Sequence, residues 1–345
     1  MSRAQLTSTV EQSSGGVVAP FLAGKNKIIN GDFGIWQRGT SFTTNYAYTA
    51  DRFIPYFAGT GATQTISQQT LTPGSISGYE SQYFMRNVVV GGSDSTNGQN
   101  TMIQYIENVQ TLIGQVTVSF WMKANSGTPK IGVGLQQGFG SGGSSTVVLN
   151  GQSATLSTSW ARYSFTFTLP SISGKTIAAG SVITLVIYFS AGSAIATFAG
   201  FNALQSNTFD IWGVQLEAGS VATPFTTASN TLQGELALCQ RYYYRTYANN
   251  NYSEIAMGSA NSTSVARAIV PLPVTMRVAP SSLDYSGLYW DDQTGVFSIS
   301  GASIFTASPN AVCISGSSSG LTQFRPYALD LQTANSSYIG FGAEL

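Results

Sequence analysis

Strict alternation of apolar and polar residues is the feature that most limits how this chain can fold. The segment QVTVSFWMKA (115–124) alternates residue by residue, and ARYSFTFTL (161–169) repeats the pattern. Two further runs have strand length, VITLVIYF (182–189) and PKIGVGLQQ (129–137), and turn-forming stretches such as GFGSGGSS (138–145) separate such runs. Successive strand side chains point to opposite faces, so many short strands with regular turns predict a β-sandwich or barrel.

Two longer segments enclose this region. KNKIINGDFGIWQRGTSF (25–42) precedes it and DIWGVQLEAGSVATPF (210–225) ends it. They are placed as the first and last strands of one sandwich would be. The sequence therefore predicts a single β-sandwich from about residue 25 to residue 228.

One helix is predicted after this sandwich. Leu232, Leu236, Cys239 and Tyr243 recur at the spacing of one helical face, and Ser229 or Asn230 can serve as the N-cap. We expect a linking helix within residues 229–244, although Gly234 weakens it by about 1 kcal/mol. Because so short a helix is unstable alone, its apolar stripe is expected to pack near a three-fold axis or between two domains.

Strand patterns resume from residue 245 to residue 345 and predict a smaller C-terminal β domain. Prolines in PLPV (271–274) confine that part of the chain to edges and turns. Residues 1–24 are polar with a short apolar end, which favours an N-terminal arm that attaches to a partner or, alternatively, a frayed terminus. The expected organisation is thus arm, sandwich, linking helix and second β domain.

The low charge of the chain narrows its partners. Only 9% of its 345 residues are charged, the formal net charge is zero, and no run of Lys or Arg occurs. Nucleic-acid or membrane-surface binding through a basic patch is therefore not expected. No apolar run is long enough for a membrane-spanning helix. Solubility must come from polar uncharged surface or from burial against other chains, and the second option suggests an oligomer.

Catalytic chemistry has little support in the sequence. There is no histidine, which excludes Ser-His-Asp and Cys-His catalysis and removes the commonest zinc ligand. A glycosidase needs only two carboxylates about 5 to 9.5 Å apart, but Asp210 is the only acid between Glu107 and Glu217. The adjacent Asp291 and Asp292 fit a turn better than an acid pair. Cys239 and Cys313 are expected to be free thiols. We therefore predict a protein that is not an enzyme.

A resemblance to known proteins rests on a combination of motifs. IINGDF (28–33), TVSFWMKA (117–124), TSWARYSFTFTL (158–169) and FDIWGVQLEAG (209–219) resemble the jelly-roll carbohydrate-binding-module family. INGDFGIWQRG (29–39), TADRF (49–53), VQLEAGSVATPF (214–225) and ELALCQRYY (235–243) resemble tailed-bacteriophage tail-fibre and receptor-binding proteins. The resemblance implies an all-β fold with a jelly-roll β-sandwich, a homotrimer, and a place in the virion after synthesis in the host cytoplasm.

The resemblance also raises the question of calcium. Family members often hold a structural calcium ion, and Asn30, Asp32 and Asp210 are the candidate ligands here. Gly34 stands where an acidic residue is usual, so these three supply only part of a calcium shell. Alternatively, Asp32 and Asp210 cap turns or pair with Arg38 or Arg52. No other cofactor is expected.

The candidate glycan-binding residues come from the polar faces of the middle strands. If those strands share a sheet, its face offers an aromatic platform flanked by amide, hydroxyl and cationic groups, which suits a sugar ring. The candidates are Trp121, Lys123, Gln136, Arg162 and Tyr188. Alternatively, Trp121 and Tyr188 pack in an oligomer interface or under a loop.

These inferences favour one function over two others. The expected function is that of a phage virion fibre protein that adheres to host surface polysaccharide without catalysis and attaches to other virion proteins through its arm. The first alternative is a purely structural virion component, either a head-decoration fibre or a tail adaptor that joins another fibre. The second is a polysaccharide depolymerase.

Overall fold

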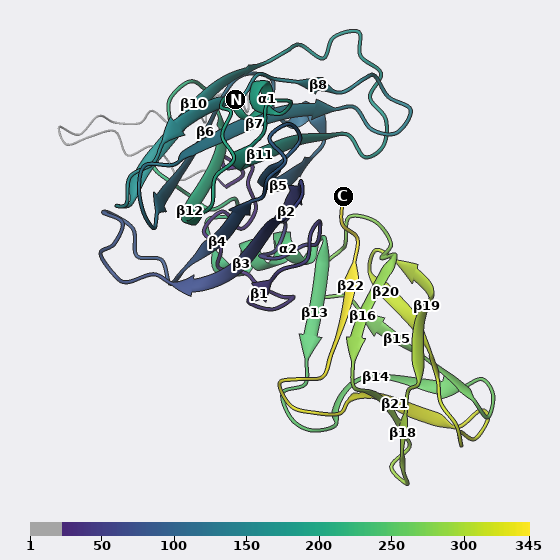
Figure 1. Cartoon of the computed structure of the whole chain (residues 1–345). Coiled ribbons are helices and arrows are strands. Elements are labelled where there is room, and N and C mark those ends of the chain that lie inside the picture. Colours follow the sequence, from purple (N-terminus) through teal and green to yellow (C-terminus); the bar gives the residue numbers. More distant parts are fainter. Residues whose placement is uncertain (1–22) are drawn as a thin grey trace, which may run out of the picture.

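The structure is a computed structural model that describes residues 23–345. Its regular elements are almost all β-strands, and Figure 1 shows a larger β-sandwich joined to a second β unit. The predicted fold class is confirmed. The predicted arm at residues 1–24 lies, except for its last two residues, outside the described part of the chain. No helix within residues 23–345 is long and apolar enough to cross a bilayer.

Two antiparallel sheets make the sandwich. Sheet 1 has the order β1 (Ser41–Phe42), β3 (Ala62–Thr70), β4 (Tyr83–Gly91), β12 (Asn207–Ala218), β6 (Gly114–Ala124), β10 (Ala161–Leu169). Sheet 2 has the order β2 (Ile54–Ala58), β5 (Gln99–Glu107), β11 (Val182–Ala191), β7 (Lys130–Gly138), β8 (Val147–Val148), and β9 (Gln152–Thr155) also pairs with β7. Two short helical turns, η1 (Val109–Thr111) and α1 (Ala196–Ala199), lie in the connections.

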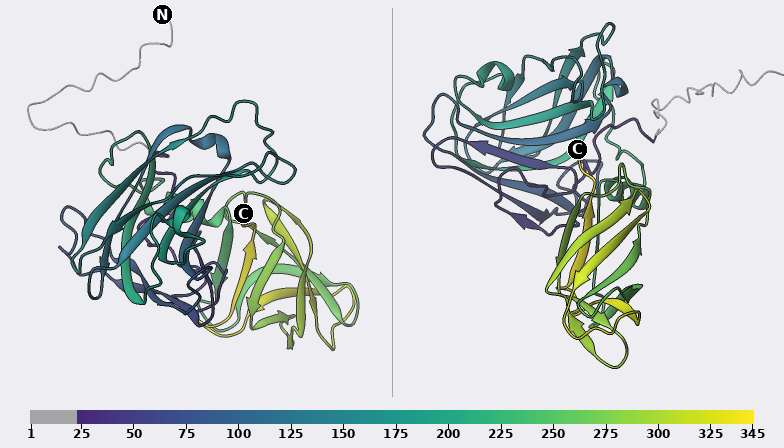
Figure 2. Two further views of the ribbon diagram at one scale, coloured as in Figure 1. Left: turned by 45° about the horizontal axis from the view of Figure 1, so that its top comes forward. Right: turned by 90° about the vertical axis from the view of Figure 1, so that its right-hand side faces the viewer.

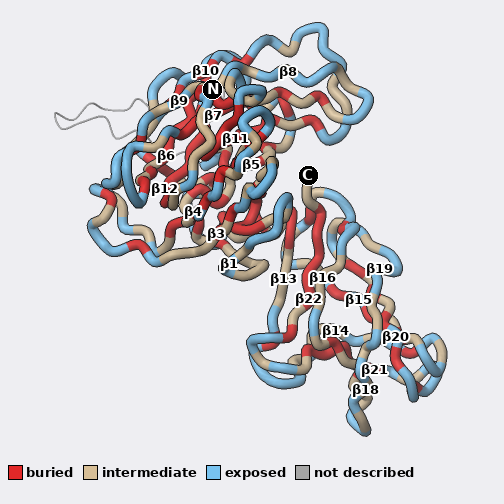
Figure 3. The backbone as a smooth tube through the Cα atoms, viewed as in Figure 1, coloured by how far each residue is buried: buried red, intermediate tan, exposed pale blue. Residues whose placement is uncertain are grey.

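The alternation seen in the sequence produces the core between these sheets. Val118 and Phe120 of β6 are fully buried, and they face Phe165 and Tyr163 of β10 across the strand pair. Figure 3 shows the buried positions following the strands of the sandwich. Burying large apolar side chains on the inner face of each sheet supplies most of the stability of such a fold, at about 25 cal/mol per Å² of apolar surface.

The segment at residues 25–42 differs from the predicted first strand. It consists mainly of turns, and within it only β1 is a strand. It nevertheless lies beside β12, because the backbone of Lys27 bonds Leu216 at 2.9 Å and that of Gly31 bonds Val214 at 2.8 Å. The buried side chain of Asn26 joins both segments by hydrogen bonds to the Val214 carbonyl and the Leu216 amide. Side-chain bonds that compete with a strand ladder explain why the motif turns.

The predicted helix exists, but of the predicted stripe only Cys239 and Tyr243 are buried. Helix α2 spans Leu232–Gln240, and Thr231 rather than Ser229 or Asn230 is its N-cap. Leu232 is 71% exposed, Leu236 is only half-buried, and Tyr243 belongs to the next strand. The buried helical residues are Glu235 and Cys239. Glu235 faces inward because its carboxylate accepts hydrogen bonds from the backbone of Asn30 and from Ser229.

The C-terminal unit contains two further sheets. Sheet 3 has the order β13 (Tyr243–Tyr247), β22 (Tyr338–Gly342), β16 (Ser282–Ser286). Sheet 4 has the order β18 (Val296–Ser298), β17 (Leu288–Asp291), β21 (Pro326–Leu331), β14 (Ser253–Ala260), β15 (Val265–Pro271), β20 (Ala311–Ser317), β19 (Gly301–Ser308). Trp290 and Leu329 belong to a core cluster separate from that of the sandwich. Asp292 accepts from the backbone of Thr294 and Gly295, which confirms the predicted turn. Both cysteines are free.

A polar junction connects the sandwich to the C-terminal unit. Arg52, only 1% exposed, pairs with Glu344, and Arg38 pairs with the same carboxylate at 3.0 Å. The Arg52 guanidinium also stacks on Tyr242 at 3.5 Å, and that of Arg38 stacks on Tyr243 at 3.4 Å from the ring centroid. Figures 1 and 2 show α2 and the C-terminal strand β22 meeting the base of the sandwich. The exact domain boundaries remain a prediction.

Replacing Glu344 by Ala tests this junction. The change leaves the buried guanidinium of Arg52 without its carboxylate, so we expect the free energy of unfolding to fall by roughly 3–5 kcal/mol. Denaturant unfolding measures the loss. Glu80→Ala removes an exposed carboxylate and serves as the control, with an expected change within about 0.5 kcal/mol. Equal effects of the two variants would contradict the importance of the Arg52–Glu344 pair.

Candidate functional site

The five predicted glycan-binding residues lie on two different sheets. Trp121 and Lys123 are on β6 and Arg162 is on β10, both in sheet 1. Gln136 is on β7 and Tyr188 is on β11, both in sheet 2. These side chains point away from the core, so they occupy opposite outer faces of the sandwich. The predicted shared platform is therefore wrong, because strands that are consecutive in sequence cross between the two sheets.

Trp121 is half-buried and packs among other aromatic residues. Its ring centroid lies 4.9 Å from that of Tyr79 and 5.3 Å from that of Trp212. The Arg162 guanidinium carbon is 4.6 Å from the Trp121 centroid. A β-carbon at Gly213, where φ is +68°, would lie 2.9 Å from the same ring. The sequence alternative, in which Trp121 packs under a loop, describes this environment.

The predicted calcium ligands are engaged in other contacts. Asp210 accepts two hydrogen bonds from Arg86, at 2.7 and 2.9 Å, and Lys123 lies 3.5 Å away. Asn30 is buried, and its side-chain amide donates to the carbonyls of Ile35 and Asp51. Within residues 23–345 no group of three or more acidic or cysteine side chains could hold a metal ion. The structure thus gives these residues structural partners, and those of Asp210 differ from the predicted Arg38 and Arg52.

Asp32 has a different environment from Asp210. Its carboxylate accepts from the backbone of Gly34 at 3.4 Å, which closes the turn of the NGDF segment. Burial raises the pKa of Asp32, and the backbone hydrogen bonds partly oppose this effect. The predicted turn-capping role fits this geometry.

Tyr188 is also covered. It is 5% exposed and packs with Val186, Ala199 and Phe201, where the segment that contains α1 crosses the outer face of sheet 2. Burial raises the pKa of Tyr188 to about 12. Gly132, its partner on β7, has no room for a side chain, because a β-carbon there would lie 1.9 Å from the Ala199 carbonyl oxygen. This end of the face is closed.

The other end of the same face carries a row of polar and aromatic side chains, in which Tyr105 and Gln136 are half-buried and Thr184 is buried. Thr184 of β11 lies between Tyr105 of β5 and Gln136 of β7 in the strand register. The hydroxyl of Tyr46, a side chain 61% exposed, lies 3.2 Å from that of Tyr105. Gln136 forms no side-chain hydrogen bond with any residue of the described part. We call Tyr46, Tyr105, Thr184 and Gln136 the tyrosine groove.

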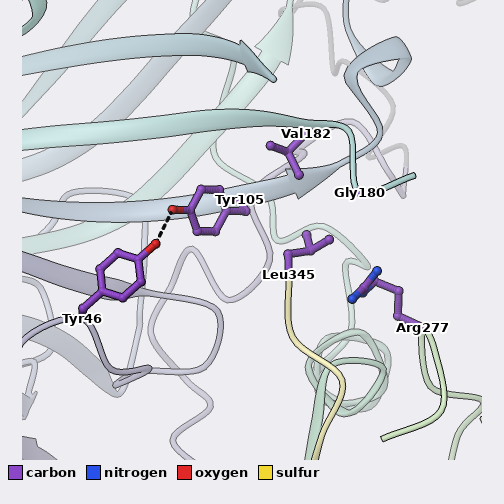
Figure 4. A pocket seen from close by; sticks show the side chains of 6 residues that line it. All are labelled: Tyr46, Tyr105, Gly180, Val182, Arg277 and Leu345. Carbon is purple, nitrogen blue, oxygen red and sulfur yellow. Dashed lines mark hydrogen bonds between the residues drawn. The ribbon is translucent and has the colours of Figure 1, made fainter. Parts of the chain in front are cut away.

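A cavity of about 340 Å³ adjoins the groove. Figure 4 shows its lining, which comes from both units of the chain: Tyr46, Tyr105, Gly180, Val182, Arg277 and Leu345. The Arg277 guanidinium donates to the carbonyls of Ala343 at 3.0 Å and Glu344 at 2.8 Å, so its position is fixed. Aromatic rings beside oriented hydroxyl, amide and guanidinium groups are the features that bind small polar ligands with apolar faces.

Glu107 is the acidic residue next to this cavity in the register, opposite Val182. Burial raises its pKa, but hydrogen bonds from Tyr242 at 2.9 Å and Arg241 at 3.0 Å outweigh burial, and the pKa is lowered overall. The carboxylate is therefore ionised at neutral pH and held by the junction. The described lining of the cavity includes no carboxylate side chain.

Sequence reasoning found Gln136 but missed Tyr46 and Tyr105. Tyr105 lies in the alternating stretch MIQYIE (102–107), which has the signal of a strand with one outward face. Tyr46 lies in a loop and is positioned by contacts that no sequence period reveals, including an edge-on contact with Tyr56 at 6.0 Å between centroids. Of these two residues, only Tyr105 had a sequence pattern that pointed to its position.

Several solved structures are similar to the sandwich. A CBM4 structure is 18% identical, with a TM-score of 0.33 over 55% of this chain and 97% of its own. The family 11 carbohydrate-binding module of Clostridium thermocellum, in complex with a β-1,3-1,4-mixed-linked tetrasaccharide, is 12% identical, with a TM-score of 0.32 over 53% and 98% of the two chains. Tailspike protein 4 of bacteriophage CBA120 is 12% identical, with a TM-score of 0.33 over 56% of this chain and 21% of its own.

Sequence comparison adds one match. No curated protein matches the chain. Residues 77–182 match the family described as carbohydrate binding domain. The matched region includes β4 to β10 and therefore both Tyr105 and Gln136. The chain thus contains a region similar to a carbohydrate-binding domain within a β-sandwich.

Trp121→Ala tests whether this ring is part of the scaffold. Because its half-buried ring packs against Tyr79 and Trp212, we expect the free energy of unfolding to fall by roughly 2–3 kcal/mol. Chemical denaturation gives the value. Tyr46→Ala removes an exposed ring as the control and should change stability by less than about 1 kcal/mol. A similarly small loss for Trp121→Ala would show that this ring is free.

Proposed function

We propose that this protein is a non-catalytic glycan-binding protein and that the tyrosine groove is its binding site. The observation that carries the proposal is the register row of Tyr105, Thr184 and Gln136, which sets an aromatic ring, a hydroxyl and an amide without a side-chain hydrogen bond side by side on the outer face of sheet 2. The carbohydrate-binding-domain match supports it, because residues 77–182 contain two of these three side chains.

The chemistry of the groove fits a sugar ring. The apolar face of a pyranose stacks on a tyrosine ring, and its hydroxyls exchange hydrogen bonds with nearby amide and hydroxyl groups. Gln136 offers one acceptor and two donors, and the fixed guanidinium of Arg277 adds further donors at the cavity. Uncharged polar groups dominate the row itself, so a neutral saccharide suits it better than a strongly anionic one.

The biological setting that we propose is a tailed-phage virion. The chain would be a homotrimeric fibre protein, synthesised in the host cytoplasm, that adheres to host surface polysaccharide and joins other virion proteins through residues 1–24. The motif resemblance to tail-fibre proteins supports this setting.

A purely structural virion component is the second candidate, and one observation favours it. Residues from the fibre-like motifs, among them Asn30, Arg52 and Tyr242, take part in contacts that fix the sandwich to α2 and to the C-terminal unit. Such motifs would serve rigidity rather than recognition. The groove would then be an incidental surface feature.

A glycan array followed by calorimetry distinguishes these candidates. The purified full chain should bind one or more glycans, and Tyr105→Ala and Gln136→Ala should each weaken that binding by about 1–3 kcal/mol, or roughly 5-fold to 150-fold. Tyr252→Ala removes an exposed tyrosine of the C-terminal unit and should leave affinity unchanged. Failure of the chain to bind any glycan would favour the structural role, and equal affinities for all variants would contradict the tyrosine groove as the binding site.

Removal of residues 1–22 tests the proposed virion attachment. The truncation keeps Gly24, whose amide bonds the Ala228 carbonyl, so the folded part should melt at an unchanged temperature. Phage particles assembled with the truncated protein should lack it when probed with antibody by electron microscopy, whereas the full chain should label the particles. Normal incorporation of the truncated chain would place the attachment elsewhere, and no labelling with the full chain would contradict a virion role.

A further inference from the structure

The outer face of sheet 4 exposes large apolar side chains. Met257 of β14 and Ile269 of β15 are each 63% exposed, and Phe305 of β19 is 54% exposed. Met257 and Ile269 are neighbours across strands β14 and β15, because each is adjacent in sequence to one residue of the opposed pair Gly258 and Ala268. All three belong to one sheet whose opposite face is buried in the core.

The strand register joins these residues into one row. Ile269 lies opposite Cys313 of β20, which in turn lies opposite Thr306 beside the bulged Phe305. In the other direction Met257 lies opposite Ala328 of β21. These positions therefore form a row across five neighbouring strands, β21, β14, β15, β20 and β19, in which Met257, Ile269 and Phe305 are exposed and Ala328 is buried. Contiguous apolar surface of this kind marks interaction sites in soluble proteins.

Carboxylates without cationic partners gather at one end of the row. Asp330 is 1% exposed, and its Oδ1 has no hydrogen-bond partner in the described part of the chain. Its neighbour on β14 is Glu254, which forms no ion pair within residues 23–345. Asp291 lies opposite Ala328, and a cavity of about 240 Å³ there is lined by Glu254, Asp291 and Met257 among others. Burial and the charges of Asp291 and Glu254 raise the pKa of Asp330 to about 6.

A nearby cation does not balance this charge. Arg325 pairs with Asp292 at 3.1 Å and also donates to Thr294. Asp292 is thereby neutralised, while Glu254, Asp291 and Asp330 are left. Carboxylates so close together favour the approach of a positive group from outside the chain.

The other end of the row carries a guanidinium that lacks an anion. Arg267 of β15 extends past Ser315, its register partner, and its guanidinium carbon lies 3.4 Å from the centroid of Phe305. Arg267 forms no ion pair with any described residue, and its buried Nε has no hydrogen-bond partner there. Both ends of the apolar row thus hold unmatched charge, and the two charges have opposite sign.

We propose that this face binds a second copy of the same chain. The apolar rows of neighbouring copies pack against each other, and the Arg267 guanidinium of each copy pairs with the Glu254 and Asp291 carboxylates of its neighbour. We choose a second copy as the partner because of charge complementarity: the surface that supplies the acids also supplies the cation. A closed ring of copies, in which the Arg267 end of each row meets the carboxylate end of the next, satisfies both ends in every copy and agrees with a homotrimer. The proposal is independent of the glycan-binding function.

A charge-reversal experiment on the full chain tests the interface. Analytical ultracentrifugation at micromolar concentration should show an oligomer. Arg267→Glu places like charges together and should raise the dissociation constant about tenfold or more, and Glu254→Arg should act in the same direction. The double variant with both changes restores the opposite pairing and should recover most of the association. Ile269→Asp puts a charge in the middle of the apolar row and should give monomers.

The control is Lys175→Glu, an equal change of charge at an exposed position of the sandwich. Melting temperatures of all variants check that the fold is intact, and Ile269→Ser replaces Ile269→Asp if that variant does not fold. A monomeric chain, or an oligomer that neither Arg267→Glu nor the Ile269 variants weaken, would overturn the proposal. Failure of the double variant to recover association would overturn the Arg267–Glu254 pairing.

Discussion

The buried pair of Arg52 and Glu344 is the interaction on which the relative placement of the two β units depends. Removing a guanidinium from water is costly unless it is paired and hydrogen-bonded, and here the carboxylate, the Tyr242 ring and the carbonyl of Tyr105 all surround it. The bond from Arg52 to the Tyr105 carbonyl is 2.9 Å long, so the junction also fixes the strand that carries the tyrosine groove. Rigidity at the junction and geometry at the groove therefore have a common origin.

Local patterns predicted the strands well because strand alternation is itself local. The run at residues 161–169 matches β10 residue for residue. Prediction was wrong where buried side chains compete with the backbone. The NGDF segment turns because the side chains of Asn26 and Asn30 form hydrogen bonds with neighbouring backbone groups. Helix α2 turns Glu235 inward because its carboxylate accepts a hydrogen bond from the backbone amide of Asn30. Partners about 200 residues apart are not visible in periodicity.

The candidate site was less predictable than the fold for a topological reason. Alternation shows which side chains share a face of one strand, but not which strands share a sheet. Trp121 and Tyr188 were grouped on that missing information, and the crossing from β6 to β7 separates them. Gln136 survives as a groove residue because its strand pairs with β11, whereas Tyr46 depends on a loop conformation that carries no sequence period.

The scarcity of charge makes the position of each charged group informative. With 15 basic and 15 acidic residues in 345, the chain places Arg38, Arg52 and Glu344 in mutual contact at the junction and pairs Arg86 with Asp210 on sheet 1. These charged groups are paired. A charged group without a partner on a partly apolar face is an exception to this pattern. Burial of Asp330 without a cation costs free energy in the isolated chain. Burial raises the pKa of Asp330 to about 6, so protonation relieves this cost in acid. At neutral pH a cation placed beside Glu254 and Asp291 by another molecule would lower the cost, which is the physical reason for expecting the outer face of sheet 4 to be covered.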